Sequence, residues 1–185
     1  WPALASHVHP DRRGQPVSYQ RARWTTPDGD FLDVDHLPAA EPRPGRPLLV
    51  LFHGLEGSAQ SHYSRAFAWW AHARGWDYAV PHFRGCSGEL NLAPRTYYSG
   101  DHAEIEWILA RLAQQHAGPI VAVGISLGGN MLMRWVQEAG AMAAQRVRAA
   151  VAVCSPLDLE ASAKALSRGL AGHLYTRMFL RTLKD

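Results

Sequence analysis

The sequence has few cysteines, no long apolar run and no cluster of positive charge. Its two cysteines, Cys86 and Cys154, stand in neither a CxxC nor a metal-ligand spacing, so no disulfide framework is indicated. No apolar stretch reaches the roughly 18 residues that span a bilayer, and the 19 lysines and arginines are dispersed rather than grouped as in a nucleic-acid-binding surface. We therefore expect no stable membrane insertion and no nucleic-acid partner. The scarcity of cysteine and the lack of a basic-then-apolar leader favour the cytoplasm.

What the sequence does contain is ordinary for a globular protein. Of its 185 residues, 47% are hydrophobic and 19% are charged, with a formal net charge of +3, and this length fits one domain with its own core. Ten histidines are scattered without the HxxxH spacing of a zinc site, so no metal or other cofactor is expected. The chain opens with Trp1 and breaks off at Asp185 in a helix-like stretch. We expect residues 1–185 to be a single incomplete domain, cut at both ends.

Turn residues and hydrophobic periodicity divide the chain into parts. Asp28-Gly29 between two strand-like flanks predicts a β-hairpin over residues 19–37, and the proline-rich segment 38–47 predicts a loop. Over residues 48–154, apolar runs alternate with segments of helical period, which indicates βαβ units and a parallel sheet with helices on both faces. Residues 157–185 are predicted to be helical. The strands of the core are expected at residues 48–52, 76–80, 120–125 and 147–154, and its helices over Tyr63–Ala71, from Ser99 or Asp101 through Leu112, and over Asn130–Glu138.

The run Gly124-Ile125-Ser126-Leu127-Gly128 places a serine between two glycines, where an apolar strand meets a helix. A serine hydroxyl is a weak nucleophile that needs a base beside it, and a sharp strand-to-helix turn exposes its oxygen. Such a turn leaves no room for side chains at Gly124 and Gly128, and the following helix directs its positive end toward a developing oxyanion. Ser126 is therefore the candidate nucleophile. The alternative is a tight turn in which the serine only caps the helix.

A second motif, His53-Gly54-Leu55-Glu56-Gly57, follows the first predicted parallel strand. Acyl transfer needs two N–H donors for its oxyanion, one from the residue after the serine and one from this loop. The backbone N–H groups of Leu55 and Leu127 are the candidates for this oxyanion hole. His53 precedes the serine, on the wrong side for the Ser, acid, His order that accompanies this kind of turn, so a role in shaping the loop is favoured.

These motifs occur in order with two others, and together they are similar to one family. The YheT-like branch of the α/β-hydrolase superfamily, with its lipid-directed relatives and the yeast medium-chain ethyl-ester synthases/esterases, resembles this chain over nearly its whole length. The resemblance implies an α/β-hydrolase fold, with a mainly parallel sheet whose C-terminal strands are missing here and with residues 157–185 as the start of a helical lid region. It also implies a Ser-Asp-His triad whose nucleophile matches Ser126. The motifs that carry the resemblance are His53–Ser58, Arg84–Glu89, Tyr98–Asp101 and Gly124–Asn130.

The acid and the base of such a triad have no matching positions in this sequence, since the resemblance implies that they follow two further strands. After Ser126 the sequence offers Asp158 and Asp185 as acids and His173 as the one histidine. A triad of Ser126, Asp158 and His173 is the less favoured interpretation. Surface or lid roles are favoured for both Asp158 and His173.

Other polar residues receive structural interpretations. Arg84 and Glu89 flank a glycine-rich loop, and an ion pair that holds this loop is favoured over contact with a substrate. Asp101 is expected to start a helix rather than to act as a catalytic acid. Cys86 and Cys154 are expected to be buried packing residues.

The leading functional hypothesis is a carboxylic ester hydrolase that acts on short- or medium-chain acyl esters through an acyl-enzyme on Ser126. Its partner would be a small-molecule ester. One alternative is an acyltransferase in which an alcohol replaces water, since both reactions share the first half. The other is a non-catalytic binding protein with the same fold. The oligomeric state is left open.

Overall fold

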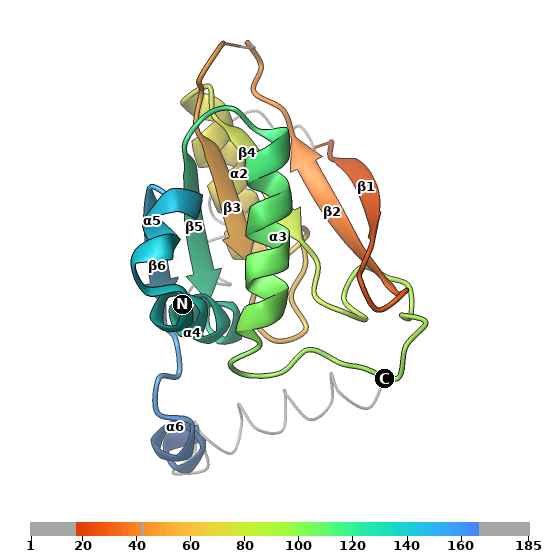
Figure 1. Ribbon diagram of the computed structural model, residues 1–185, viewed down its shortest axis with the longest axis vertical. Coiled ribbons are helices and arrows are strands. Elements are labelled where there is room, and N and C mark those ends of the chain that lie inside the picture. The colour runs from red at the N-terminus through yellow and green to blue at the C-terminus, as the bar shows by residue number, and fades with distance from the viewer. Residues whose placement is uncertain (1–17, 42, 167–185) are drawn as a thin grey trace.

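Six strands form one sheet, in the order β1-β2-β4-β3-β5-β6, in the computed structural model, which describes residues 18–41 and 43–166. β1 and β2 run antiparallel, β2 runs antiparallel to β4, and the remaining neighbours are parallel. The four parallel strands therefore end at one edge of the sheet, at the bottom of Figure 1. The strands are β1 (Gln20–Thr25), β2 (Phe31–Leu37), β3 (Leu48–Phe52), β4 (Asp77–Pro81), β5 (Ile120–Ile125) and β6 (Ala149–Val153).

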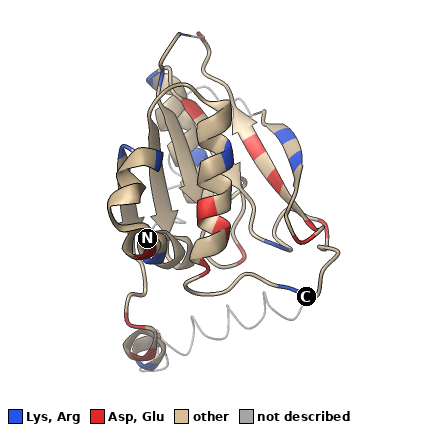
Figure 2. Ribbon diagram, in the orientation of Figure 1, with Lys and Arg blue, Asp and Glu red and all other residues tan. Residues whose placement is uncertain are grey.

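The hairpin predicted over residues 19–37 is confirmed. Gly29 takes a φ of +80° in the loop between β1 and β2, a conformation that glycine adopts without strain. Directly opposite residues on the two strands carry opposite charges: Arg21 faces Asp35, and Arg23 faces Asp33. Figure 2 shows them as blue bands on β1 beside red bands on β2. Such cross-strand pairs fix the register of the hairpin, which then extends the parallel sheet through β2 and β4.

Helices cover both faces of the sheet, as predicted (Figure 1). α3 and α4 pack on one face, where their apolar side chains meet those of β3 in one buried cluster. α2 packs on the other face, against a second cluster of strand residues. β3 consists of apolar residues alone because both of its faces are covered. The helices are α2 (His62–Ala73), α3 (His102–Gln115), α4 (Leu127–Ala139), the 3₁₀ turn η1 (Gly140–Met142), α5 (Ala143–Arg146) and α6 (Leu159–Leu166).

One helix packs in a way that its apolar spacing does not reveal, and one strand boundary needs correction. The buried face of α2 consists of Ser64, Ala68 and Ala71, while Ala66 is exposed. Small residues let this helix approach the sheet closely, so the larger apolar side chains flank the contact instead of filling it. The last strand begins later than predicted, at Ala149, because its pairing with β5 starts at that residue.

A buried cluster of charges anchors the long loop between β4 and α3. The Arg84 side chain, 3% exposed, pairs with Asp30 at 2.8 Å and with Glu104 at 2.9 Å. The Asp30 carboxylate also accepts hydrogen bonds from the Leu92 N–H at 2.9 Å and from the Asn91 side-chain amide at 3.0 Å. The loop is thus tied at once to the hairpin and to the first turn of α3.

The predicted ion pair between Arg84 and Glu89 is wrong. Arg84 points inward to the buried carboxylates, whereas Glu89 lies on the surface and pairs with Arg23 at 3.0 Å. Asp101 stands at the N-cap of α3, as predicted, and its carboxylate pairs with Arg95 at 2.8 Å.

The buried carboxylate of Asp30 makes the stability of the fold depend on acid pH. Burial raises the pKa of Asp30, but the hydrogen bonds that the carboxylate accepts lower it to about 2, against an ordinary value of about 3.9 in an unfolded chain. A carboxyl group whose pKa is lower in the folded state stabilises the fold above about pH 4, and this contribution is lost as the pH falls toward 2. We expect Asp30→Asn to be less stable than wild type at neutral pH and to lose stability less steeply through this window.

Urea unfolding at several pH values between about 2 and 7 measures this difference. Glu138→Gln is the matched control, because Glu138 is exposed in an i,i+4 pair with Arg134 and its loss should cost no more than about 0.5 kcal/mol. Equal pH slopes for wild type and Asp30→Asn would contradict the prediction.

Candidate active site

Ser126 occupies a strained turn between β5 and α4. Its φ and ψ are 51° and −116°, outside the regions that non-glycine residues normally adopt. Its N–H donates to the Val153 carbonyl at 2.9 Å, and its carbonyl accepts the first helical hydrogen bond from Asn130 at 3.0 Å. The backbone is therefore fixed on both sides, while the hydroxyl has no hydrogen-bond partner among residues 18–41 and 43–166. This geometry leaves the Ser126 oxygen accessible to an incoming group.

Three glycines allow the turn, because a side chain at any of them would collide with backbone or with a buried atom. A Cβ on Gly124 would lie 2.5 Å from the Gly129 Cα, and a Cβ on Gly128 would lie 2.4 Å from the carbonyl oxygens of Phe52 and His53. A Cβ on Gly129 would lie 1.9 Å from the Ser155 hydroxyl oxygen. The sequence analysis predicted that a side chain would not fit at Gly124 and Gly128. It did not predict this for Gly129, although Gly129 directly follows Gly128.

Strained backbone gathers at the carboxyl edge of the sheet. Three non-glycine residues in the described part of the chain have a positive φ, namely Glu56 after β3, Ser126 after β5 and Cys154 after β6. Each such conformation costs of order 1–3 kcal/mol and persists where the surroundings impose it, often at functional sites. Three neighbouring strand ends therefore carry strain around one serine.

The loop after β3 passes directly beside Ser126. A Cβ on Gly54 would be 3.4 Å from the Ser126 Cβ. The loop is a tight turn, in which the Gly57 N–H donates to the Gly54 carbonyl at 3.0 Å. The same carbonyl accepts a hydrogen bond of 2.7 Å from the His53 ring. With its carbonyl held twice, the peptide between Gly54 and Leu55 has a fixed orientation.

All but one of the backbone N–H groups in residues 54–58 have an acceptor. The exception is Leu55, for which the described residues provide none. The Leu127 N–H opens α4 and so has no partner within its helix. Both sequence-predicted oxyanion donors are thus N–H groups without an acceptor among the described residues, and their role in catalysis stays a prediction. The occupied N–H groups donate from Gly54 to the Tyr63 hydroxyl at 3.0 Å, from Glu56 to the Tyr97 hydroxyl at 2.9 Å, from Gly57 to the Gly54 carbonyl at 3.0 Å and from Ser58 to the Ser61 hydroxyl at 3.0 Å.

His53 braces this loop, as the sequence predicted. Its side chain is fully buried, and both ring nitrogens are occupied: Nε2 accepts from the Phe83 N–H at 3.0 Å, so Nδ1 carries the proton that is donated to the Gly54 carbonyl. Burial lowers the pKa of His53 to about 3. A neutral imidazole without a free nitrogen cannot take a proton from Ser126.

Asn130 joins the loops around the serine, a role that the sequence analysis missed. Its side-chain oxygen accepts hydrogen bonds from the Gly100 N–H at 2.9 Å and the Ser99 hydroxyl at 3.3 Å, and its amide donates to the Pro156 carbonyl at 2.9 Å. The loops before α3 and after β6 are thereby held against the first turn of α4. Its position in the Gly124–Asn130 motif was the one signal that could have pointed to it.

The other candidates from the sequence have structural surroundings of their own or lie outside the described residues. Asp158 precedes α6, where its carboxylate accepts from the Ala161 N–H at 2.8 Å as a helix cap, and His173 falls outside the described residues. Cys86 is partly buried against the core, whereas Cys154 is exposed, so the prediction that both cysteines are buried is wrong for Cys154. Its positive φ turns the chain out of the sheet after β6.

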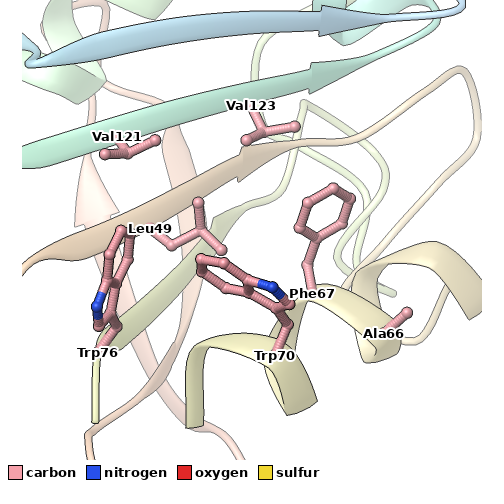
Figure 3. Close-up of a pocket in the computed structure, with 7 residues that line it drawn as sticks. All are labelled: Leu49, Ala66, Phe67, Trp70, Trp76, Val121 and Val123. Atoms are coloured by element: carbon pink, nitrogen blue, oxygen red, sulfur yellow. The ribbon is translucent and has the colours of Figure 1, made fainter. Parts of the chain in front are cut away.

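An apolar groove of about 340 Å³ lies on the α2 face of the sheet and not at Ser126. Figure 3 shows the rings of Trp70 and Trp76 on its α2 side and Val121 and Val123 of β5 opposite them. None of its lining residues belongs to the Ser126 turn or to residues 53–57. The groove is therefore separate from the candidate site.

The close approach at Gly128 gives a test of the turn. We expect Gly128→Ala to lower the free energy of unfolding by about 3 kcal/mol or more, because the new methyl group meets two backbone carbonyls that cannot rotate away. Gly54→Ala is the matched control, since its methyl group would make only ordinary contacts of 3.4 Å or more. Urea unfolding compares the two variants, and equal midpoints would contradict this account of the turn.

Comparison with known proteins gives the same fold. A family model described as the alpha/beta hydrolase fold matches residues 47–177. Among solved structures, an esterase from Pyrococcus furiosus superposes with a TM-score of 0.60 at 18% identity, covering 84% of this chain and 58% of the esterase. A lidless α/β serine hydrolase from Xanthomonas campestris gives a TM-score of 0.59 at 17% identity, covering 77% and 63%. In the described part of the chain no helix is long and apolar enough to cross a membrane.

Curated relatives are similar over most of this chain. YheT of Escherichia coli, which carries an esterase name, is 42% identical to this chain over 164 residues. The match covers 88% of this chain and 47% of YheT. The human phospholipase ABHD3 is 28% identical over 68% of this chain and 32% of its own length. The yeast medium-chain fatty acid ethyl ester synthase/esterase 2 is 31% identical over 66% and 27%. The chain thus spans less than half the length of these relatives, and it belongs to the α/β-hydrolase family, in the branch that contains YheT.

Proposed function

We propose that this chain carries the nucleophile and the oxyanion donors of a serine esterase that acts on short- or medium-chain acyl esters. The observation that carries the proposal is the strained turn at Ser126, which lies beside the Gly54 loop. The N–H groups of Leu55 in that loop and of Leu127 at the start of α4 have no acceptor among the described residues. Backbone N–H groups aimed at one point in a preorganised site stabilise a developing negative charge. The positive end of α4 adds to the same effect.

The reaction would proceed in two halves. The Ser126 oxygen attacks the ester carbonyl carbon, its proton passes to a base, and the carbonyl oxygen becomes an oxyanion between the two N–H groups. Collapse of this intermediate expels the alcohol, which takes the proton back, and leaves an acyl group on Ser126. Water then attacks the acyl-enzyme and releases the acid. His53 is not the base, since both of its nitrogens are occupied.

The names of the relatives support an ester as the substrate. YheT carries an esterase name, ABHD3 is named a phospholipase, and the yeast relative is named for medium-chain ethyl esters. Two of these names are esterase names, and the third names an enzyme that acts on phospholipids, which contain ester bonds. The yeast name also covers ester synthesis, which favours transfer to an alcohol as a second candidate function.

A fluorophosphonate probe tests the nucleophile. We expect the full-length protein to be labelled at Ser126, because an activated serine attacks phosphorus as it attacks a carbonyl carbon, and we expect Ser126→Ala to abolish the labelling. Ser155→Ala is the matched control, since Ser155 lies on the neighbouring strand end with its oxygen buried beside Gly129. It should keep the labelling. Folded, full-length protein that is not labelled would instead support the non-catalytic binding protein.

A competition between water and ethanol separates the two reactions. If the acyl-enzyme is open to alcohols, a medium-chain ester incubated with ethanol should give the ethyl ester in addition to the free acid, and both products should vanish in Ser126→Ala. Product analysis by mass spectrometry measures the ratio. Free acid as the one product at high ethanol would rule out the acyltransferase.

A further inference from the structure

The Leu55 N–H is useful as an oxyanion donor only if the turn that carries it is held in one conformation. Two of the four residues of the turn, Gly54 and Gly57, are glycines and are held by the hydrogen bond between them. The third, Glu56, takes a φ of 53°, where side chains are rarely found. The Leu55 N–H lies in the same peptide plane as the Gly54 carbonyl, which the Gly57 N–H holds across the turn. The positive φ of Glu56 brings Gly57 into place for this hydrogen bond, so the conformation of Glu56 helps to fix the peptide that carries the Leu55 N–H.

One hydroxyl group holds Glu56 in this conformation from two sides. The Tyr97 oxygen accepts from the Glu56 N–H at 2.9 Å, and the same hydroxyl donates to the Glu56 carboxylate at 2.7 Å. Burial raises the pKa of Tyr97 above its ordinary value near 10, so the hydroxyl keeps the proton that it donates. Both the backbone and the side chain of the strained residue are therefore tied to a single point.

The position of the Tyr97 hydroxyl is itself fixed by its surroundings. The Tyr97 ring is 7% exposed and stacks on Phe83 with ring centroids 5.3 Å apart, and Phe83 stacks on Phe52, the last residue of β3. A few residues after Tyr97, the loop is bound to α4 through Gly100 and Asn130. The Tyr97 ring is thus packed in the core, and the loop that carries it is bound to the helix that follows Ser126.

We propose that Tyr97 is a positioning residue for acyl transfer at Ser126, which holds Glu56 so that the Leu55 N–H stays aimed at the oxyanion. This inference rests on the proposed esterase function and adds to it a residue from a separate loop, 41 positions along the chain from Glu56. Tyr97 does not touch the substrate in this scheme. It acts through the turn.

The test uses the full-length protein and a chromogenic medium-chain ester. Tyr97→Phe keeps the stacked ring and removes the hydroxyl, so we expect kcat to fall about 10- to 100-fold, less than for outright loss of an oxyanion donor, with KM changed by no more than about twofold. Tyr98→Phe is the matched control, because the neighbouring Tyr98 is exposed and its hydroxyl makes no hydrogen bond to the described residues. It should leave both constants unchanged.

Substitutions at the exposed Glu56 separate positioning from a general structural role. Glu56→Ala loses the carboxylate and should lower kcat, whereas Glu56→Gln keeps an acceptor for the Tyr97 hydroxyl and should retain it. Glu56→Gly adopts a positive φ without help. The double variant Tyr97→Phe/Glu56→Gly should therefore recover most of the kcat that Tyr97→Phe loses.

The outcomes distinguish this inference from the proposed function. Wild-type protein that neither reacts nor is labelled at Ser126 would overturn both. A labelled, active wild type with unchanged kcat in Tyr97→Phe would overturn the role of Tyr97 alone, as would a double variant no more active than Tyr97→Phe. If Tyr97→Phe does not fold, the Glu56 variants test the role of Tyr97 instead. Equal kcat in Glu56→Ala and Glu56→Gln would then contradict that role.

Discussion

The candidate site depends on one close contact between backbones, where the first turn of α4 lies against the end of β3. The Cβ that Gly128 lacks would sit 2.4 Å from two carbonyl oxygens of β3 and its following residue. Without this contact, α4 would stand away from the sheet and the residues after β3 would not reach Ser126. Because of this contact, the first turn of α4 and the turn after β3 lie side by side. The turn that carries Leu55 therefore lies beside the start of the helix that Leu127 opens.

The sequence was a good guide wherever burial decided the outcome. The runs Leu48–Phe52 and Ile120–Ile125 are strands over the predicted residues, because a parallel strand covered on both faces must be apolar throughout. The hairpin followed from Asp28-Gly29, whose conformation is local. The face of α2 did not follow, since the sequence does not say whether a helix approaches a sheet on small side chains or stands off on large ones. Ala66 and Ala68 look alike in a periodicity count, yet one is exposed and the other is buried.

Partners distant along the chain were the part that sequence reasoning could not supply. Arg84 was paired with Glu89, five positions away, but the fold brings it to Asp30, 54 positions away. Tyr97 and Asn130 likewise act on residues about 30 to 40 positions removed, and no local pattern marks such contacts. Ser126, Leu55 and Leu127 were found because strand, turn and helix are local features. Their catalytic roles remain predictions that the geometry supports.

The two edges of the sheet differ in chemical character. β1 is bordered by the guanidinium groups of Arg21 and Arg23, each paired across to β2, and charge of this kind discourages another strand from adding there. β6 has the sequence Ala-Ala-Val-Ala-Val and pairs with β5 on one side, so within the described residues its other backbone edge is unpaired and carries no charged side chain. Addition of a strand to this sheet is therefore directional: the hairpin side is closed by electrostatics, and the side next to the serine turn is the one at which pairing can continue.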